Sequence, residues 1–160
     1  MNRISPSSLL WRTAGLAALT GARSMMGPAL LGRQLRKQPS RRLGRSRLAL
    51  MQSSRTAKVL TGLAAGELVG DKLPNCPNRT DPPALIGRAL SGALIGATMA
   101  TRQRQPRRTG ALVGAMSAVV GTYVTFHLRK RLGQTTGFPD PVWAVLEDGL
   151  VIAAGRRLLR

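Results

Sequence analysis

"TGALVGAMSAVVGTYVTFHL", Thr109–Leu128, is a stretch of 20 residues without a charged side chain. Two arginines precede it, and the basic cluster at residues 129–131 follows it. At about 1.5 Å per residue, a helix of this length matches the roughly 30 Å hydrocarbon core of a bilayer. The stretch therefore predicts a helix that crosses a membrane.

Four further apolar segments accompany it, at about residues 8–31, 57–73, 82–101 and 141–155. The third of these is as long as Thr109–Leu128 but carries Arg88, and the first is interrupted by Arg12, Arg23 and Gly27-Pro28. The remaining two are shorter, and each contains two carboxylates. We expect an all-α, polytopic membrane helix bundle of four to five spans.

Two of these helices have clear start signals. Asp81 precedes Pro82, and Asp140 precedes Pro141. Asp is a favoured N-cap residue, and proline suits the first helical position because its missing N–H has no partner there. Helix capping and a direct functional role both stay open for Asp81 and Asp140.

Glycines recur at four-residue spacing within the apolar segments. This spacing places them on one helical face, where small residues let helix backbones approach closely in lipid. A soluble helix would lose about 1 kcal/mol per interior glycine relative to alanine. The pattern therefore favours a membrane bundle with GxxxG packing faces, and it occurs at three places: Gly62, Gly66 and Gly70; Gly92 and Gly96; Gly110 and Gly114.

The chain is strongly basic, with 25 Lys and Arg against 6 acids and a formal net charge of +19. Such a chain prefers anionic partners, either nucleic acid or the phosphate surface of a membrane. Aromatic residues make up only 3% of the chain, which disfavours single-strand nucleic-acid binding because that usually uses stacking platforms. We expect the bilayer and its anionic headgroups as partners, and a homo-oligomer stays open.

The basic residues concentrate in the connections between the apolar segments. We expect one membrane domain over residues 1–160, in which 33–56 forms a cytoplasmic loop or a surface helix on anionic lipid. With five spans, the connection 33–58, the connection 102–108 and the C-terminus fall on one side. The positive-inside rule then places the N-terminus outside and the C-terminus in the cytoplasm.

The N-terminal residues allow two locations. The first 26 residues are rich in Arg and Ser and lack acids, which resembles a mitochondrial transit peptide in composition. In a bacterial chain the same residues belong to a weakly apolar membrane helix. We expect a multi-pass protein of the bacterial inner membrane, with a mitochondrial membrane as the alternative.

Enzymatic chemistry finds no support in the sequence. Cys76 is the single cysteine and His127 the single histidine, so neither has partners for a Cys- or His-based metal site. No phosphate-binding loop and no dinucleotide fingerprint occurs in the chain. We expect no enzyme, no catalytic residue, no metal and no cofactor.

All six carboxylates lie beside or within the apolar segments. A charge at the bilayer centre costs roughly 2.5–3.5 kcal/mol on insertion scales, so such groups face the bundle interior and pair. We therefore predict one intramembrane carboxylate–arginine cluster, with Arg23 and Asp140 as less certain members. Its main members are Glu67, Asp71, Lys72, Arg79, Asp81, Arg88, Glu147 and Asp148.

Two interpretations of this cluster stand side by side. Intramembrane ionisable groups usually mark a substrate, ion or proton site, which predicts a small-solute or ion transporter. The same charge cost also demands pairing in a structural network, which predicts a non-catalytic membrane scaffold with a lipid-binding basic face. A soluble basic nucleic-acid binder is the third hypothesis.

Three stretches resemble a family of small bacterial integral membrane proteins known only as a domain of unknown function. They are "GARSMMGPALL" (21–31), "AGELVGDKLPNCPNRTDPPALIGRALSGALIGA" (65–97) and "GFPDPVWAVLEDGLVIAAG" (137–155). The resemblance covers about residues 10–157. It implies a polytopic inner-membrane protein but no activity, and so it assigns no catalytic residue. The basic stretch 33–56 is heavier than the family pattern leads us to expect.

Overall fold

The computed structural model describes residues 6–70, 80–136 and 140–159, and these residues form helices and turns without a β-strand. Asp71, Lys72 and Arg79 of the predicted cluster therefore lie outside the described residues, as does Cys76. The elements are α1 Pro6–Ala22, α2 Met26–Lys37, α3 Arg41–Gly44, the 3-10 helix η1 Arg47–Gln52, α4 Ser54–Gly70, α5 Pro82–Arg102, α6 Arg107–Thr136 and α7 Asp140–Leu158. The all-α prediction is confirmed for this part of the chain.

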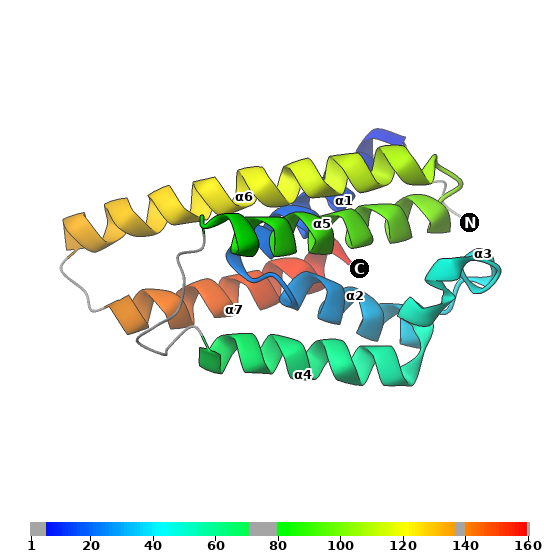
Figure 1. The fold of residues 1–160 in the computed structure, drawn as a ribbon, viewed down its shortest axis with the longest axis horizontal. Coiled ribbons are helices and arrows are strands. Elements are labelled where there is room, and N and C mark those ends of the chain that lie inside the picture. The colour runs from blue at the N-terminus through cyan, green and yellow to red at the C-terminus, as the bar shows by residue number, and fades with distance from the viewer. Residues whose placement is uncertain (1–5, 71–79, 137–139, 160) are drawn as a thin grey trace.

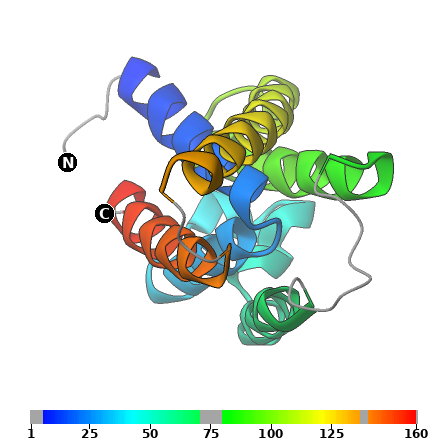
Figure 2. The ribbon, with the colours of Figure 1, turned by 90° about the vertical axis from the view of Figure 1, so that its left-hand side faces the viewer.

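The long helices lie side by side and alternate in direction along the bundle (Figures 1 and 2). Apolar side chains from three of them form the main core, in which Leu16 of α1, Leu31 of α2 and Ile95 of α5 are fully buried. The short elements α3 and η1 lie at one end of the bundle, which also holds the connection between α5 and α6 (Figure 1). We call this end the basic end, because it carries the arginine-rich segments 33–47 and 102–108.

The segment 8–31, which we expected to form one interrupted helix, forms two. The chain turns at Arg23–Met25, so that α1 and α2 make a hairpin. Gly27-Pro28 does not break a helix; it belongs to the first turn of α2. A proline fits there because the first four N–H groups of a helix have no intrahelical partner.

This hairpin adds a reversal of chain direction that the predicted topology lacks. The five-segment count placed the two termini on opposite sides, whereas α1 begins and α7 ends toward the basic end (Figure 1). The extra reversal comes from the turn at Arg23–Met25, which was not expected. The basic segments still gather at one end, as the connection pattern predicted.

The closest helix pair is α5 with α6. A Cβ atom added at Gly96 would overlap the carbonyl oxygen of Gly110, and one added at Gly114 would overlap that of Gly92. The two backbones thus touch through four glycines, and no side chain fits between them. A second such crossing joins α1 to α6, where a Cβ on Gly121 would overlap the carbonyl oxygen of Ala18.

The glycines of α4 differ in their surroundings from those of α5 and α6. Gly62 and Gly66 on α4 have no atom within 4 Å of an added Cβ. These two glycines therefore make no close helix contact within the described residues, and a packing role for them stays a prediction. Their spacing resembles that of the glycines on α5 and α6, but α4 packs mainly on α2 and η1.

The basic stretch 33–56 is ordered by local polar contacts. The Gln52 side chain links the end of η1 to the residue before α3. Its Oε1 accepts from the Ser40 backbone N–H at 2.5 Å, and its Nε2 donates to the Ser40 carbonyl at 3.3 Å. Leu43, Leu48 and Met51 point inward and are buried. At its end, Ser53 Oγ accepts from the Thr56 backbone N–H at 3.0 Å and so caps α4. This stretch thus joins α2 to α4 through helices that pack on the bundle.

Two helices are long and apolar enough to cross a membrane, Pro82–Arg102 and Arg107–Leu132, among the residues that the structure describes. The first coincides with the predicted segment 82–101, and the second contains Thr109–Leu128. The starts are also as expected, since Asp81 is the N-cap residue of α5 and α7 begins at Asp140. The number of spans stays a prediction.

Candidate functional site

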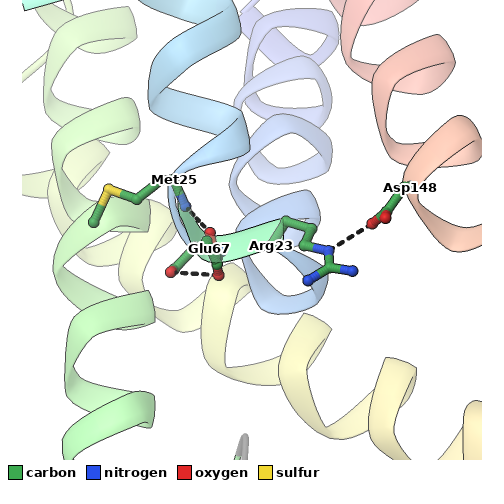
Figure 3. A network of polar contacts seen from close by, with 5 residues as sticks. Arg23, Met25, Glu67 and Asp148 are labelled. Atoms are coloured by element: carbon green, nitrogen blue, oxygen red, sulfur yellow. Dashed lines mark hydrogen bonds and ion pairs between the residues drawn. The ribbon is translucent and has the colours of Figure 1, made fainter. Parts of the chain in front are cut away.

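The turn between α1 and α2 is the point where charged side chains from distant helices meet. Arg23 Nε donates to Asp148 Oδ1 of α7 at 2.5 Å, across 125 residues of sequence. The Arg23 side chain is 3% exposed and that of Asp148 is 19% exposed. Figure 3 shows the guanidinium of Arg23 directed at Asp148. The pair therefore ties α7 to the end of α1.

Glu67 of α4 approaches the same turn. Its Oε1 accepts from the backbone N–H and from the hydroxyl of Ser24, both at 2.8 Å. Its Oε2 accepts from the backbone N–H of Met25 at 2.9 Å, a contact drawn in Figure 3. One carboxylate thus binds three donors of the turn and ties α4 to the start of α2. We call Arg23, Ser24, Met25, Glu67 and Asp148 the turn cluster.

The start of α2 has no side-chain cap of its own. Met25 occupies the N-cap position of α2 and makes no side-chain cap hydrogen bond. Ser, Thr, Asp and Asn are the usual residues there, because their side chains satisfy N–H groups at the helix start. Glu67 of α4 instead accepts from the N–H groups of Ser24 and Met25, just before the helix, where its negative charge faces the positive end of the α2 dipole.

The turn cluster contains one buried cation and two carboxylates. Moving a charge from water into an apolar helix bundle costs free energy. Close polar or charged partners are needed to offset that cost. Arg23 has the Asp148 carboxylate, and Glu67 has three donors that include no formal charge. Both carboxylates thus have close polar partners at the junction of α1, α2, α4 and α7.

The other predicted members occupy different positions. Arg88 is buried on α5, where its side chain is 4% exposed. Asp81 lies before Pro82 and Pro83 and makes no side-chain cap hydrogen bond, which fits the absence of an N–H on either proline. Of Asp140 and Glu147 the structure describes the backbone within α7. Their membership of one functional site stays a prediction.

Sequence reasoning missed the backbone donors of Ser24 and Met25. The signal was present, because "ARSMMGP" (22–28) places an arginine and a serine immediately before a proline-containing helix start. In residues 6–70, 80–136 and 140–159, no group of three His, Cys, Asp or Glu side chains is placed to hold an ion. The contacts of the turn cluster hold α4 and α7 to the turn between α1 and α2.

The fold and the turn cluster together define an all-helical protein with two helices able to cross a membrane and a charged junction at one helix turn. The chain belongs to the family described as Domain of unknown function (DUF4126), whose model matches residues 10–155. The resemblance stated from the three sequence blocks is thereby confirmed. No match was found among curated proteins or among solved structures.

Proposed function

We propose that the chain is an integral protein of the bacterial inner membrane that lets ions or small solutes permeate beside the turn cluster. The membrane part rests on the exposed apolar surface. On α6, only 22% of the most apolar 18-residue stretch is buried, whereas the core helix of a soluble protein is mostly buried. Its exposed side chains follow one stripe and include Leu112, Met116, Val120, Val124 and Leu128.

Other helices extend this apolar surface around the molecule. Exposed apolar side chains lie on α4, α5 and α7, for example Leu63, Leu90 and Leu150. Monomeric soluble proteins rarely expose apolar patches larger than a few hundred Å². Lipid tails would cover all of these faces at once, and the glycine contacts of α5 with α6 are the kind that hold helices together in lipid.

Charge supports one orientation of the bundle. The arginine-rich segments gather at the basic end, and cytoplasmic ends of membrane proteins carry an excess of Lys and Arg. The turn cluster lies away from the basic end, at the turn of the α1–α2 hairpin, and α6 and α7 extend beyond it (Figure 1). We therefore propose a cytoplasmic basic end, with the turn cluster away from the cytoplasmic surface of the membrane.

The permeation part rests on the turn cluster and on how loosely its outer helices pack. α4 meets the rest of the bundle mainly through α2 and η1, and α7 does so mainly through α1 and α2. The α1, α5 and α6 helices form the tighter unit. Glu67 and Asp148 thus fasten two peripheral helices to one turn. In this proposal, a proton or a monovalent cation passes between these helices by binding to and leaving the two carboxylates.

Flux into liposomes tests this proposal. We expect purified protein in sealed vesicles to speed the entry of protons, reported by a trapped pH dye, or of potassium ions. Replacing Glu67 by Gln or Asp148 by Asn removes an ionisable group and should lower the rate at least about tenfold, the change that 1.4 kcal/mol produces. The matched control is Lys58→Gln, which removes an exposed charge from the opposite end of α4.

The outcomes separate transport from the scaffold alternative. The scaffold alternative is supported by the contacts of the turn cluster, because they join the turn to α4 and α7. In that case, wild-type protein would leave proton and potassium entry at the rate of empty vesicles. The two substitutions would then change thermal stability alone, and the permeation proposal would be wrong.

A further inference from the structure

The basic end carries two arginine segments that are far apart in sequence and adjacent in space. One is α3 with η1, where Arg41, Arg45 and Arg47 are exposed. The other is the turn from α5 to α6, where Arg104, Arg107 and Arg108 are exposed. α3 packs against α5, and both segments lie at the same end of the bundle (Figure 1). We call these six arginines the basic face.

The basic face has no acidic residue near it in sequence. Residues 1–66 and 82–139 contain no Asp or Glu, so both segments lie in acid-free parts of the chain. Arg23, in contrast, has Asp148 as a partner. A group of like charges costs free energy through mutual repulsion, so an anionic partner stabilises it.

Arg104 of the basic face has a backbone conformation that glycine adopts more easily. Arg104 has φ 64° and is a non-glycine residue in the left-handed region. It follows the C-cap residue Gln103, and the backbone N–H of Gln105 donates to the Ala100 carbonyl at 2.9 Å. This is the six-to-one hydrogen bond of a Schellman motif, whose left-handed position is usually glycine. Glycine would adopt this conformation without the steric cost that a Cβ atom brings.

The short elements hold the other three arginines outward. The side chain of Gln52 closes the segment onto Ser40, and the inward faces of α3 and η1 are the buried Leu43, Leu48 and Met51. Leu50 is exposed on η1, three residues after Arg47. Arginines beside an exposed apolar side chain fit the boundary between phosphate headgroups and acyl chains.

We propose that the basic face binds the phosphate headgroups of anionic phospholipids in the leaflet at the basic end. A guanidinium pairs with phosphate through parallel hydrogen bonds, and basic residues near an anionic membrane surface contribute about equally. The partner is a lipid rather than a nucleic acid because the exposed apolar faces of α5 and α6 place this end against a bilayer. The proposal shares the membrane setting of the proposed function but does not depend on permeation.

Binding of a fluorescent phosphatidylglycerol to the full-length protein in neutral detergent tests the proposal, with phosphatidylcholine as the uncharged comparison. We expect phosphatidylglycerol to bind more tightly. Replacing Arg104, Arg107 and Arg108 together by Gln should weaken its binding about a hundredfold, at roughly fivefold per arginine. The matched control removes three charges from the far end of α6, by replacing Arg129, Lys130 and Arg131 with Gln, and should change the affinity by less than about fivefold.

A single substitution separates binding from folding. Arg104→Gly removes one charge and also relieves the left-handed strain, so the melting temperature should rise while the affinity for phosphatidylglycerol falls roughly fivefold. Replacing Arg41, Arg45 and Arg47 by Gln provides a second test on a different segment.

Three results would overturn the proposal. The first is an unchanged affinity for phosphatidylglycerol in Arg104→Gly and in both triple variants of the basic face. The second is an equal loss in the control at residues 129–131, which would show that net charge alone is responsible. The third is tighter binding of a short duplex DNA that the same basic-face variants abolish, which would assign the face to nucleic acid. Failure of the flux experiment leaves each of these results unaffected.

Discussion

Replacing Arg23 by Ala is expected to destabilise the protein by about 3–5 kcal/mol, the range found when one partner of a buried ion pair is removed. Arg23 is almost fully buried, and its guanidinium lies 2.5 Å from Asp148. Without it, the Asp148 carboxylate stays within the bundle without that cation, and α7 loses its attachment to the α1–α2 turn. The reverse change, Asp148→Asn, leaves the guanidinium without its carboxylate and should be of similar size.

A double substitution shows whether the loss reflects the pair or the space it fills. Arg23→Met with Asp148→Leu replaces both charges by apolar side chains, a change that is often neutral or stabilising for buried pairs. We expect this double variant to recover most of the melting temperature, measured by tryptophan fluorescence in detergent. If each single variant melts like the wild type, the ion pair does not hold α7 and the account of the turn cluster is wrong.

The second large effect is expected at the crossing of α5 and α6. A Cβ at Gly96 would overlap the carbonyl oxygen of Gly110, and the atom that must give way is backbone rather than a flexible side chain. Overpacking of this kind typically costs about 1–3 kcal/mol, and Gly96→Leu should exceed the cost of Gly96→Ala. We expect Gly96→Leu to lower the melting temperature strongly and to reduce the amount of folded protein that can be purified.

Gly62 of α4 is the matched control for this experiment. An added Cβ there meets no atom within 4 Å, so Gly62→Ala should leave the fold intact and should stabilise the helix slightly. Equal tolerance of alanine and leucine at Gly96 and at Gly62 would mean that α5 and α6 do not pack through their glycines.

The helices that carry the membrane signal could be predicted from the sequence. Local features define them, since Pro82–Arg102 and Arg107–Thr136 are long apolar runs with charged ends. The start of α5 after Asp81 follows from the Asp-Pro pair in the same way. The hairpin of α1 and α2 could not be predicted, because Gly27-Pro28 has the same composition whether it breaks one helix or begins another.

The turn cluster was predicted in part. Carboxylates in apolar segments must find partners, and this argument selected Glu67, Asp148 and Arg23 without knowing their arrangement. Spacing along the chain cannot show that Arg23 and Asp148, 125 residues apart, form a pair. Nor can side-chain chemistry show that Glu67 binds mainly backbone N–H groups, since every residue but proline carries one.

Glycine spacing alone does not predict which helix faces pack closely. The same four-residue spacing occurs at Gly92 and Gly96, which contact α6, and at Gly62 and Gly66. A Cβ atom added at either of the latter two would meet no atom within 4 Å. Whether such a face is used depends on which helix lies opposite, and that is a property of the whole bundle.

Insertion in the bilayer is the central claim, and extraction of isolated membranes with alkaline carbonate tests it most directly. This treatment opens vesicles and releases proteins that are held only by surface charge, which matters for a chain of net charge +19. We predict that the full-length protein stays in the membrane pellet. Its release into the supernatant would contradict the account, because the exposed apolar faces of α4, α5, α6 and α7 would then need a covering other than lipid.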